Sequence, residues 1–387
     1  MSAVQPATLA WLERLVAHET VPGASNLPLI KDVEKELYRL GIPFRVVAGS
    51  RAGTSNLLAK VGPPDLPALL LSAHTDVVHA ETDQWSSHPF RLARRNRCFY
   101  GRGTTDMKGF IAAILGQLPM IASMKLTRPL AIALSCDEEG RVEGVRPLLA
   151  SIRAAGDLPY ACIVGEPTSM NVAVAHKGKA ALRVIIRGRA AHASAPARGQ
   201  SAILGAARLV AKLEEFQRQL AQEPGDPRFP LPTPSINVGR ISGGVAVNVV
   251  PERCELDLEI RASPAQDLTC LVDGVRVLGE SLAHEMRNET PEAGVETIVE
   301  SQYPGLDERS GVAELIAALA GGESGLAVDF GTEAGLYSQT LEVPTVICGP
   351  GDIAQAHVVD EYINEGELAR AERFIARVAE WCVAPDS

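Results

Sequence analysis

The chain has 387 residues, of which 47 are acidic and 37 are lysine or arginine, and its formal net charge at pH 7 is -10. This acidic balance argues against a nucleic-acid-binding protein, because that class needs basic surface to neutralise phosphates. No stretch approaches the roughly 20 apolar residues of a transmembrane helix, so no membrane association is expected.

The N-terminal part of the chain predicts the helices and strands of an α/β domain. Apolar residues recur at helical spacing over 8–19 and over 29–40, and we interpret both segments as helices that cover a sheet. Apolar runs typical of strands follow at 44–47, 56–61 and 68–72. Residues 84–99, which include several arginines, are predicted to form a loop.

Strands and helices then alternate as far as residue 164. A helix is predicted over 107–121, a strand that ends at Ser135, a helix over 145–155 and a strand over 161–164. This alternation predicts a sheet of mainly parallel strands that helices cover on both faces.

The order of elements changes between residues 177 and 301. The segments predicted there run strand, helix, strand, strand, helix, strand, at 180–187, 201–220, 235–241, 255–261, 267–286 and 294–300. This βαββαβ order is that of a ferredoxin-like split βαβ sandwich. Afterwards the α/β pattern resumes, at 312–319, 335–339, 344–348 and 365–382.

Two domains are therefore predicted, as the length also suggests, because single hydrophobic cores stop growing below this size. The first domain comprises 1–176 and 302–387 and holds a mixed, mainly parallel sheet. The second is the inserted module of 177–301.

The N-terminus and the cysteines bear on the cellular compartment. Residues 1–6 lack a basic segment followed by an apolar core, so no secretory signal is expected. The seven cysteines are scattered without CxxC spacing, which fits free thiols better than a disulfide framework. We therefore predict a cytoplasmic protein.

Five metal-capable side chains follow apolar runs or a glycine-flanked turn: His74, Asp106, Glu139, Glu166 and His357. One such side chain alone is usually a satisfied surface group, but strand ends of an open α/β sheet meet in one crevice. Two imidazoles and three carboxylates without a thiolate suit Zn²⁺, and also Co²⁺ or Mn²⁺. If Asp106 is shared, each of two ions has three protein ligands and an open position, as catalytic metal sites do.

Two further carboxylates are predicted to assist this site. Asp76 lies two residues after His74, on the same side of an extended segment, so its carboxylate is predicted to accept the second N–H of the imidazole. Glu138 directly precedes Glu139, and the pair can divide its work, with Glu139 as ligand and Glu138 as general base. A solvated acidic loop is the alternative interpretation of this pair.

These motifs together resemble the M20 metallopeptidase and deacylase family. The matching stretches are Ala73-His74-Thr75-Asp76, Asp106-Met107-Lys108-Gly109, Asp137-Glu138-Glu139, Gly165-Glu166-Pro167-Thr168-Ser169, Ala175-His176-Lys177-Gly178, His192-Ala193-Ser194, Pro196-Ala197-Arg198-Gly199, Gly331-Thr332-Glu333-Ala334 and Gln355-Ala356-His357. The resemblance implies a metallopeptidase-like catalytic domain with the same five ligands, Asp106 as the bridge and Glu138 as the base. It also implies a cis peptide bond between Asp106 and Met107.

The resemblance further implies that the inserted module is a lid and dimerisation domain, so a homodimer is expected. His192 matches the family histidine that reaches into the partner subunit's site to hold the oxyanion, although the motif reads His-Ala-Ser and not the commoner His-Ser-Ser. The candidates for substrate contacts are Arg261, Asn248, Thr332 and Lys177, with Arg261 expected to pair with a carboxylate through a two-bond fork.

On this basis we expect a hydrolase that uses two divalent ions, Zn²⁺ in the first place and Co²⁺ as an alternative, to cleave the amide of a small N-acyl amino acid. N2-acetyl-L-ornithine is the first candidate substrate. Succinyl-diaminopimelate, acetylcitrulline and dipeptides remain alternatives, because all have an amide next to a carboxylate. A non-catalytic scaffold is disfavoured, because it would have no use for Glu138, which is predicted to ligate nothing.

Overall fold

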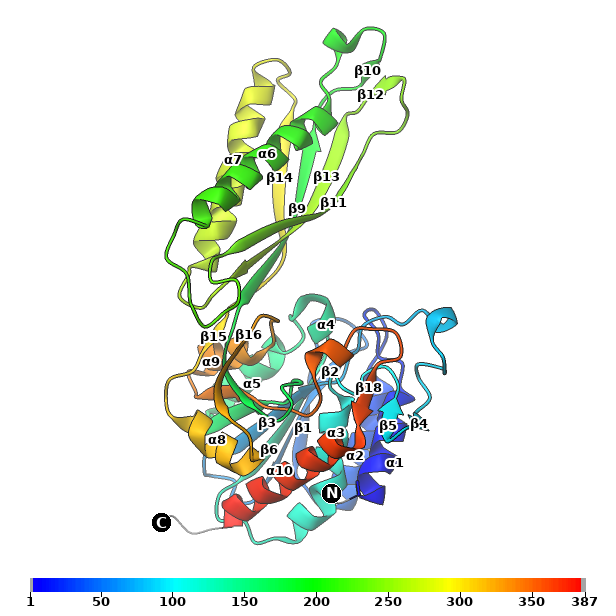
Figure 1. Ribbon diagram of the computed structural model, residues 1–387, viewed down its shortest axis with the longest axis vertical. Helices are drawn as coiled ribbons and strands as arrows, with labels where there is room; N and C mark the ends of the chain where they lie inside the picture. Colours follow the sequence, from blue (N-terminus) through cyan, green and yellow to red (C-terminus); the bar gives the residue numbers. More distant parts are fainter. Residues whose placement is uncertain (1–2, 384–387) are drawn as a thin grey trace. The chain divides into compact units, whose positions relative to one another are not determined.

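The computed structural model describes residues 3–383, apart from the side chain of residue 141 (Figure 1). The chain divides into two compact units. Unit 1 comprises Met1–Ala175, Leu306–Ala327 and Thr332–Ser387, and unit 2 comprises His176–Gly305 and Val328–Gly331. Across residues 3–383, no helix is both long and apolar enough to cross a lipid bilayer.

A mixed sheet forms the centre of unit 1, and in the described part of the chain it has nine strands. Their order is β1-β2-β6-β3-β7-β17-β8-β15, with β16 paired to β8. The bounds are Phe44–Ala48 (β1), Ser55–Val61 (β2), Leu69–His74 (β3), Leu130–Ser135 (β6), Ala161–Val164 (β7), Val172–His176 (β8), Leu306–Asp307 (β15), Ser324–Val328 (β16) and Thr345–Ile347 (β17).

The strands β6, β3, β7 and β17 in the middle of this sheet run parallel to one another. Strands β1 and β2 are antiparallel on one flank, and β8 is antiparallel to β17 on the other. Every residue of β3, β6 and β7 is buried, as expected for parallel strands covered on both faces. The predicted α/β fold with a mixed sheet is therefore confirmed, and the parallel strands are those in its middle.

Helices cover both faces of the sheet of unit 1. The helices α1 (Pro6–Val16), α2 (Leu27–Arg39), α3 (Lys108–Ser123), α8 (Val312–Ala320) and α10 (Glu365–Val383) share one apolar core with the sheet. Helices α5 (Arg146–Ala155) and α9 (Ala334–Leu341) pack together and contact strands β1, β2, β7 and β17. Helix α4 (Glu138–Arg141) is a single turn directly after β6.

The predicted loop over 84–99 is partly wrong. Strands β4 (Ala93–Arg95) and β5 (Cys98–Tyr100) form a hairpin there, and β18 (Tyr362–Asn364) pairs with β5. Asn96 and Arg97 between the two strands both have positive φ, as a type I′ hairpin turn requires. The strand β8 was also absent from the prediction.

Unit 2 contains a four-stranded antiparallel sheet in the order β11-β13-β9-β14. Its elements are β9 (Gly178–Arg187), α6 (Ala202–Leu220), β11 (Ser235–Gly243), β13 (Arg253–Ala262), α7 (Leu268–Arg287) and β14 (Gly294–Tyr303). Both helices pack on one face of the sheet, against alternate apolar residues of its strands (Figure 1). The predicted βαββαβ order is confirmed. A two-stranded ribbon of β10 (Ala191–His192) and β12 (Val249–Val250) completes the unit.

Candidate metal centre

Three of the predicted ligands lie at the carboxyl ends of neighbouring parallel strands. His74 is the last residue of β3, Glu139 lies in the first turn after β6, and Glu166 follows β7 by two residues. Because β6, β3 and β7 are adjacent and parallel, their ends meet at one edge of the sheet of unit 1. Asp106 precedes α3, and His357 follows the short 3₁₀ helix Ile353–Gln355.

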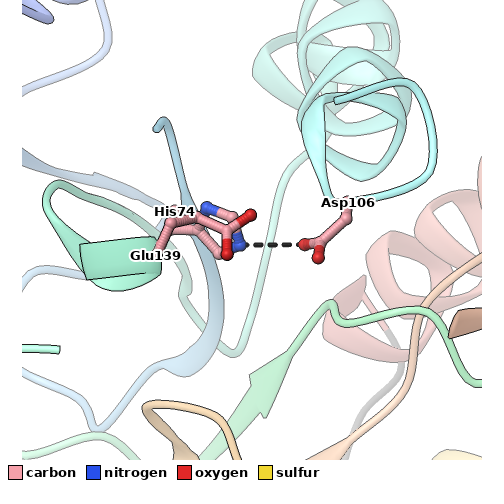
Figure 2. Close-up of side chains that lie close together, drawn as sticks. All are labelled: His74, Asp106 and Glu139. Carbon is pink, nitrogen blue, oxygen red and sulfur yellow. Dashed lines mark hydrogen bonds and ion pairs between the residues drawn. The ribbon is translucent and has the colours of Figure 1, made fainter. Parts of the chain in front are cut away.

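Asp106 lies between the two imidazoles. Its Oδ1 is 2.9 Å from Nε2 of His74, a contact that Figure 2 shows beside Glu139, and its Oδ2 is 3.1 Å from Nε2 of His357. His357 Nε2 also lies 3.0 Å from Oε1 of Glu139, and His74 Nε2 lies 3.7 Å from Oε1 of Glu166. The structure thus brings all five predicted ligands together, with one oxygen of Asp106 facing each histidine.

Burial and mutual repulsion shift the pKa values of the carboxyl groups in this cluster. Burial raises the pKa of Glu166 well above its usual range, and the charge of Asp106 adds to the shift. Burial likewise raises the pKa of Glu139 to about 7, with Asp106 adding and His357 opposing. Burial would also raise the pKa of Asp106, but hydrogen bonds with His357 and His74 hold it well below its usual range.

The cluster fits divalent cations. Several carboxyl groups are removed from water and placed side by side, which is costly unless positive charge is close to them. The donor atoms are carboxylate oxygens and imidazole nitrogens without a thiolate, a set that suits Zn²⁺ or Co²⁺. The side chain of His357 is 48% exposed, so the cluster is open to solvent on that side.

Glu138 is buried at the start of α4 and belongs to the same cluster. One carboxylate oxygen of Glu138 lies within 4.8 Å of donor atoms of both His74 and Glu166, so distance alone would also allow it to bind an ion. Burial raises its pKa well above the usual range; His74 opposes this shift, and the charges of Glu139 and Asp76 add to it.

The predicted contact between the carboxylate of Asp76 and His74 is wrong. His74 Nδ1 lies 2.9 Å from the backbone carbonyl oxygen of Asp76 and 3.8 Å from its Oδ1. The carboxylate instead accepts the backbone N–H groups of Glu138 at 3.1 Å and Glu139 at 2.9 Å. The reason is that the first N–H groups of a helix have no intrahelical partner and need an acceptor from elsewhere. Because a carbonyl only accepts, Nδ1 of His74 carries the proton, and Nε2 is the nitrogen that can bind a cation.

Two buried carboxyl groups to which the sequence analysis assigned no role contact the segments that carry the ligands. Glu361 accepts hydrogen bonds from the backbone N–H groups of Thr105 and Asp106. Glu333 accepts hydrogen bonds from the hydroxyl groups of Ser72 on β3 at 2.6 Å and Ser135 on β6 at 2.8 Å. Glu333 is part of a quoted motif, whereas Glu361 has no motif that could have indicated it.

The peptide bond between Asp106 and Met107 is cis, as the resemblance implies.

His192 lies on the ribbon of unit 2 with an exposed side chain. Its Nδ1 accepts the backbone N–H of Ser194 at 3.2 Å and lies 2.7 Å from the Ser194 hydroxyl oxygen. The proton of the neutral imidazole is therefore on Nε2. The carbonyl oxygen of Asn248 accepts the N–H of Ala193 at 2.9 Å, so unit 2 places Asn248 next to His192.

The remaining predicted substrate-binding residues have different surroundings. Arg261 on β13 donates from Nε to Glu259 at 2.6 Å, whereas its Nη1 is buried and has no hydrogen-bond partner among residues 3–383. Lys177 donates to the carbonyl oxygen of Leu231 at 2.6 Å, and the Thr332 hydroxyl accepts the N–H of Ala334 at 3.0 Å. Each of these two side chains thus contacts a backbone group of the protein. Both are also buried, so neither is open to a substrate in this conformation.

Comparison with known proteins gives a consistent family. The model of peptidase family M20/M25/M40 matches residues 70–381. An acetylornithine deacetylase of Photorhabdus laumondii is 34% identical over 360 residues, which cover 92% of this chain and 90% of the relative.

Solved structures of the same family share the fold. A metallo-carboxypeptidase of the M20 family from Sulfolobus solfataricus aligns with a TM-score of 0.80 at 15% identity and covers 98% of this chain and 99% of its own. A dinuclear metal-binding peptidase of the M20 family from Bacillus subtilis aligns with a TM-score of 0.67 at 15% identity and covers 97% of both chains. The resemblance read from the motifs is confirmed, and the chain is a hydrolase that belongs to peptidase family M20/M25/M40.

Proposed function

We propose that the protein hydrolyses the amide bond of N2-acetyl-L-ornithine to L-ornithine and acetate in arginine biosynthesis. The observation that carries the chemistry is the position of Asp106, with one oxygen at 2.9 Å from His74 and the other at 3.1 Å from His357. The choice of substrate is supported by the Photorhabdus relative, whose identity of 34% extends over most of both chains.

Two divalent ions would be held by this cluster, Zn²⁺ in the first place and Co²⁺ as an alternative. His74, Asp106 and Glu166 would hold one ion, and His357, Asp106 and Glu139 the other. When bound, such ions polarise the scissile carbonyl and make a water molecule more acidic. The pairing of each imidazole with a different oxygen of Asp106 supports this division.

Glu138 would move the proton of the reaction. It would take a proton from the attacking water and give it to the nitrogen of the leaving amine. Burial raises the pKa of Glu138 well above its usual range, so the group can carry a proton during part of the cycle, although bound cations would oppose this shift. Asp76 would act on the same step by fixing the backbone of Glu138 and the ring of His74.

We propose a homodimer formed through unit 2, in which His192 of one protomer serves the site of its partner. The N–H of Ser194 donates to Nδ1 of His192, so Nε2 carries the proton and can donate it to a developing oxyanion. Asn248, which directly precedes β12 and accepts the N–H of Ala193 beside His192, would contact polar groups of the same substrate.

Arg261 would bind the α-carboxylate of the substrate. Its guanidinium hydrogen-bonds with the side chains of Glu259 and Tyr303, and the buried Nη1 without a partner among the described residues is the donor left for a ligand. A cytoplasmic location is proposed as well, because the seven cysteines are all free thiols.

A panel of substrates tests this proposal. Metal-free enzyme is loaded with Zn²⁺ or Co²⁺ and assayed with N2-acetyl-L-ornithine, acetylcitrulline, succinyl-diaminopimelate and a dipeptide. We expect kcat/KM to be highest for N2-acetyl-L-ornithine by at least about tenfold, a difference of about 1.4 kcal/mol in transition-state binding. A dipeptide as the best substrate would reassign the protein as a peptidase, and no hydrolysis of any amide would refute the proposed chemistry.

A further inference from the structure

Glu361 is a fully buried carboxylate that holds the turn on which Asp106 lies. Its Oε1 accepts the backbone N–H groups of Thr105 at 2.9 Å and Asp106 at 3.2 Å. Its Oε2 accepts a hydrogen bond from Nη1 of Arg102 at 2.7 Å. Both oxygens therefore accept hydrogen bonds, and neither contacts a side chain that could bind a metal ion.

The same residue connects the turn of Asp106 with the segment of His357. Glu361 follows His357 by four residues, and its own carbonyl oxygen accepts the N–H of Gly101 at 3.0 Å. The hydroxyl of Thr105 donates to the carbonyl oxygen of Tyr362 at 2.6 Å. Contacts of Glu361 and its neighbour Tyr362 thus join the segment that carries Asp106 to the segment that carries His357.

A neutral side chain cannot replace this carboxylate at equal strength. Its two oxygens accept three N–H donors from two sides, whereas a glutamine amide has one acceptor oxygen and an NH₂ group that only donates. In Glu361→Gln, the NH₂ group must face either Arg102 or the two peptide N–H groups. Hydrogen bonds to a charged acceptor are also about twice as strong as neutral ones.

We propose that Glu361 is a positioning residue that directs Asp106 toward His357 and thereby sets the affinity of the ion held between them. This inference rests on the metal-dependent function proposed above. Asp76 makes the same kind of contact on another ligand, because its carboxylate accepts hydrogen bonds from the backbone N–H groups of Glu138 and Glu139. Outer partners of metal ligands typically change metal affinity by about 10–100-fold when they are replaced.

The test uses three variants of the full-length chain. Glu361→Gln removes the charge and one acceptor. The double variant Arg102→Met with Glu361→Gln also removes the positive charge that the single variant leaves buried without its partner. Glu372→Gln is the matched control, because Glu372 is a buried carboxyl group on α10 that accepts the N–H of Gln5 and is not part of the cluster.

Co²⁺ titration of metal-free protein, followed by calorimetry and visible absorption, gives the affinity of each ion, and thermal unfolding without metal gives the stability. We expect two ions on the unmodified protein and on Glu372→Gln. In Glu361→Gln, one ion should bind about 10–100-fold more weakly. The double variant should regain stability but keep this weaker binding.

Two results would overturn this inference and leave the proposed function intact. One is a titration of Glu361→Gln that matches the unmodified protein. The other is full recovery of affinity in the double variant, because the defect would then come from the unpaired Arg102. If Glu361→Gln does not fold, the double variant still measures the affinity. An unmodified protein that binds no divalent ion would refute the proposed function itself, and the inference with it.

Discussion

The change Asp76→Asn distinguishes two roles for this buried carboxyl group. The sequence predicts that the carboxylate orients His74, whereas in the structure it accepts the N–H groups of Glu138 and Glu139, and His74 uses the backbone carbonyl. Asparagine keeps the shape and the backbone carbonyl but has a single side-chain acceptor. One of the two N–H groups would face an NH₂ donor, and the contact of Asp76 with His74 would persist.

The size of the effect follows from these contacts. A buried N–H that loses its acceptor costs about 1–3 kcal/mol, so we expect the free energy of unfolding to fall by about 2 kcal/mol. Glu138 and Glu139 would shift together, so kcat and the affinity of the ion assigned to Glu139 should each fall by about 10–100-fold. The ion assigned to His74 and Glu166 should bind as before.

Denaturant unfolding, steady-state kinetics and Co²⁺ titration measure these three quantities. Asp267→Asn is the matched control, because Asp267 accepts the N–H groups of Thr269 and Cys270 at the start of α7, and asparagine is about as good a helix cap as aspartate. If Asp76→Asn instead loses the ion assigned to His74 and retains the other, the carboxylate acts on the imidazole and the reasoning from the structure is refuted.

Four further experiments test the roles proposed for these residues and one of the shifted pKa values. Glu138→Ala should retain both ions but lower kcat by about 10²–10⁴-fold, because it removes a proton carrier and no ligand. Metal analysis that finds a lost ion would overturn this role. Asp106→Ala should lower the occupancy of both ions and Glu139→Ala mainly that of one, and single-ion losses in both variants would contradict the bridge. Subunits of Glu138→Ala and His192→Ala can be mixed to form hybrid dimers. If His192 serves its partner, each hybrid dimer has one intact site and activity should reappear. Background activity after verified subunit exchange would exclude this arrangement. Burial lowers the pKa of His176 to about 4, so its contribution to stability is complete above about pH 6.5 and decreases by up to about 3 kcal/mol as the pH falls to 4. The variant His176→Gln should show a smaller decrease in unfolding experiments between these pH values, and an equal decrease would count against the shift.

The positions of the ligands could be predicted because each depends on a local pattern. All residues of β3 and β6 are buried, so both strands are visible in the sequence as continuous apolar runs. The metal-capable side chains that follow such runs, His74 after the first and the acidic run Asp137-Glu138-Glu139 after the second, then lie at the edge where parallel strands end. No knowledge of long-range contacts is needed for this step.

The contacts that hold the ligands depend on tertiary structure and were missed. Glu361 is 255 residues away from Asp106 in sequence, and the stretch around it has no pattern that indicates a buried acceptor. The N–H donors that face the carboxylate of Asp76 depend on how the end of β3 lies beside the turn after β6. The hairpin of β4 and β5 was missed for another reason. Its strands are three residues long and read Ala-Arg-Arg and Cys-Phe-Tyr, so neither alternates apolar and polar residues as a half-buried strand does.

The carboxyl groups around the cluster differ in what their oxygens contact. Those of Asp106 and Glu139 face imidazoles, and those of Asp76 and Glu361 face backbone N–H groups. Glu138 is buried, and the charges of Glu139 and Asp76 add to the burial that raises its pKa well above the usual range. Such a group is costly for the fold, which points to a role in chemistry. Because Asp76 fixes Glu138 through its backbone N–H, the carboxyl group is held in place and can still accept and release a proton, as acid–base catalysis requires.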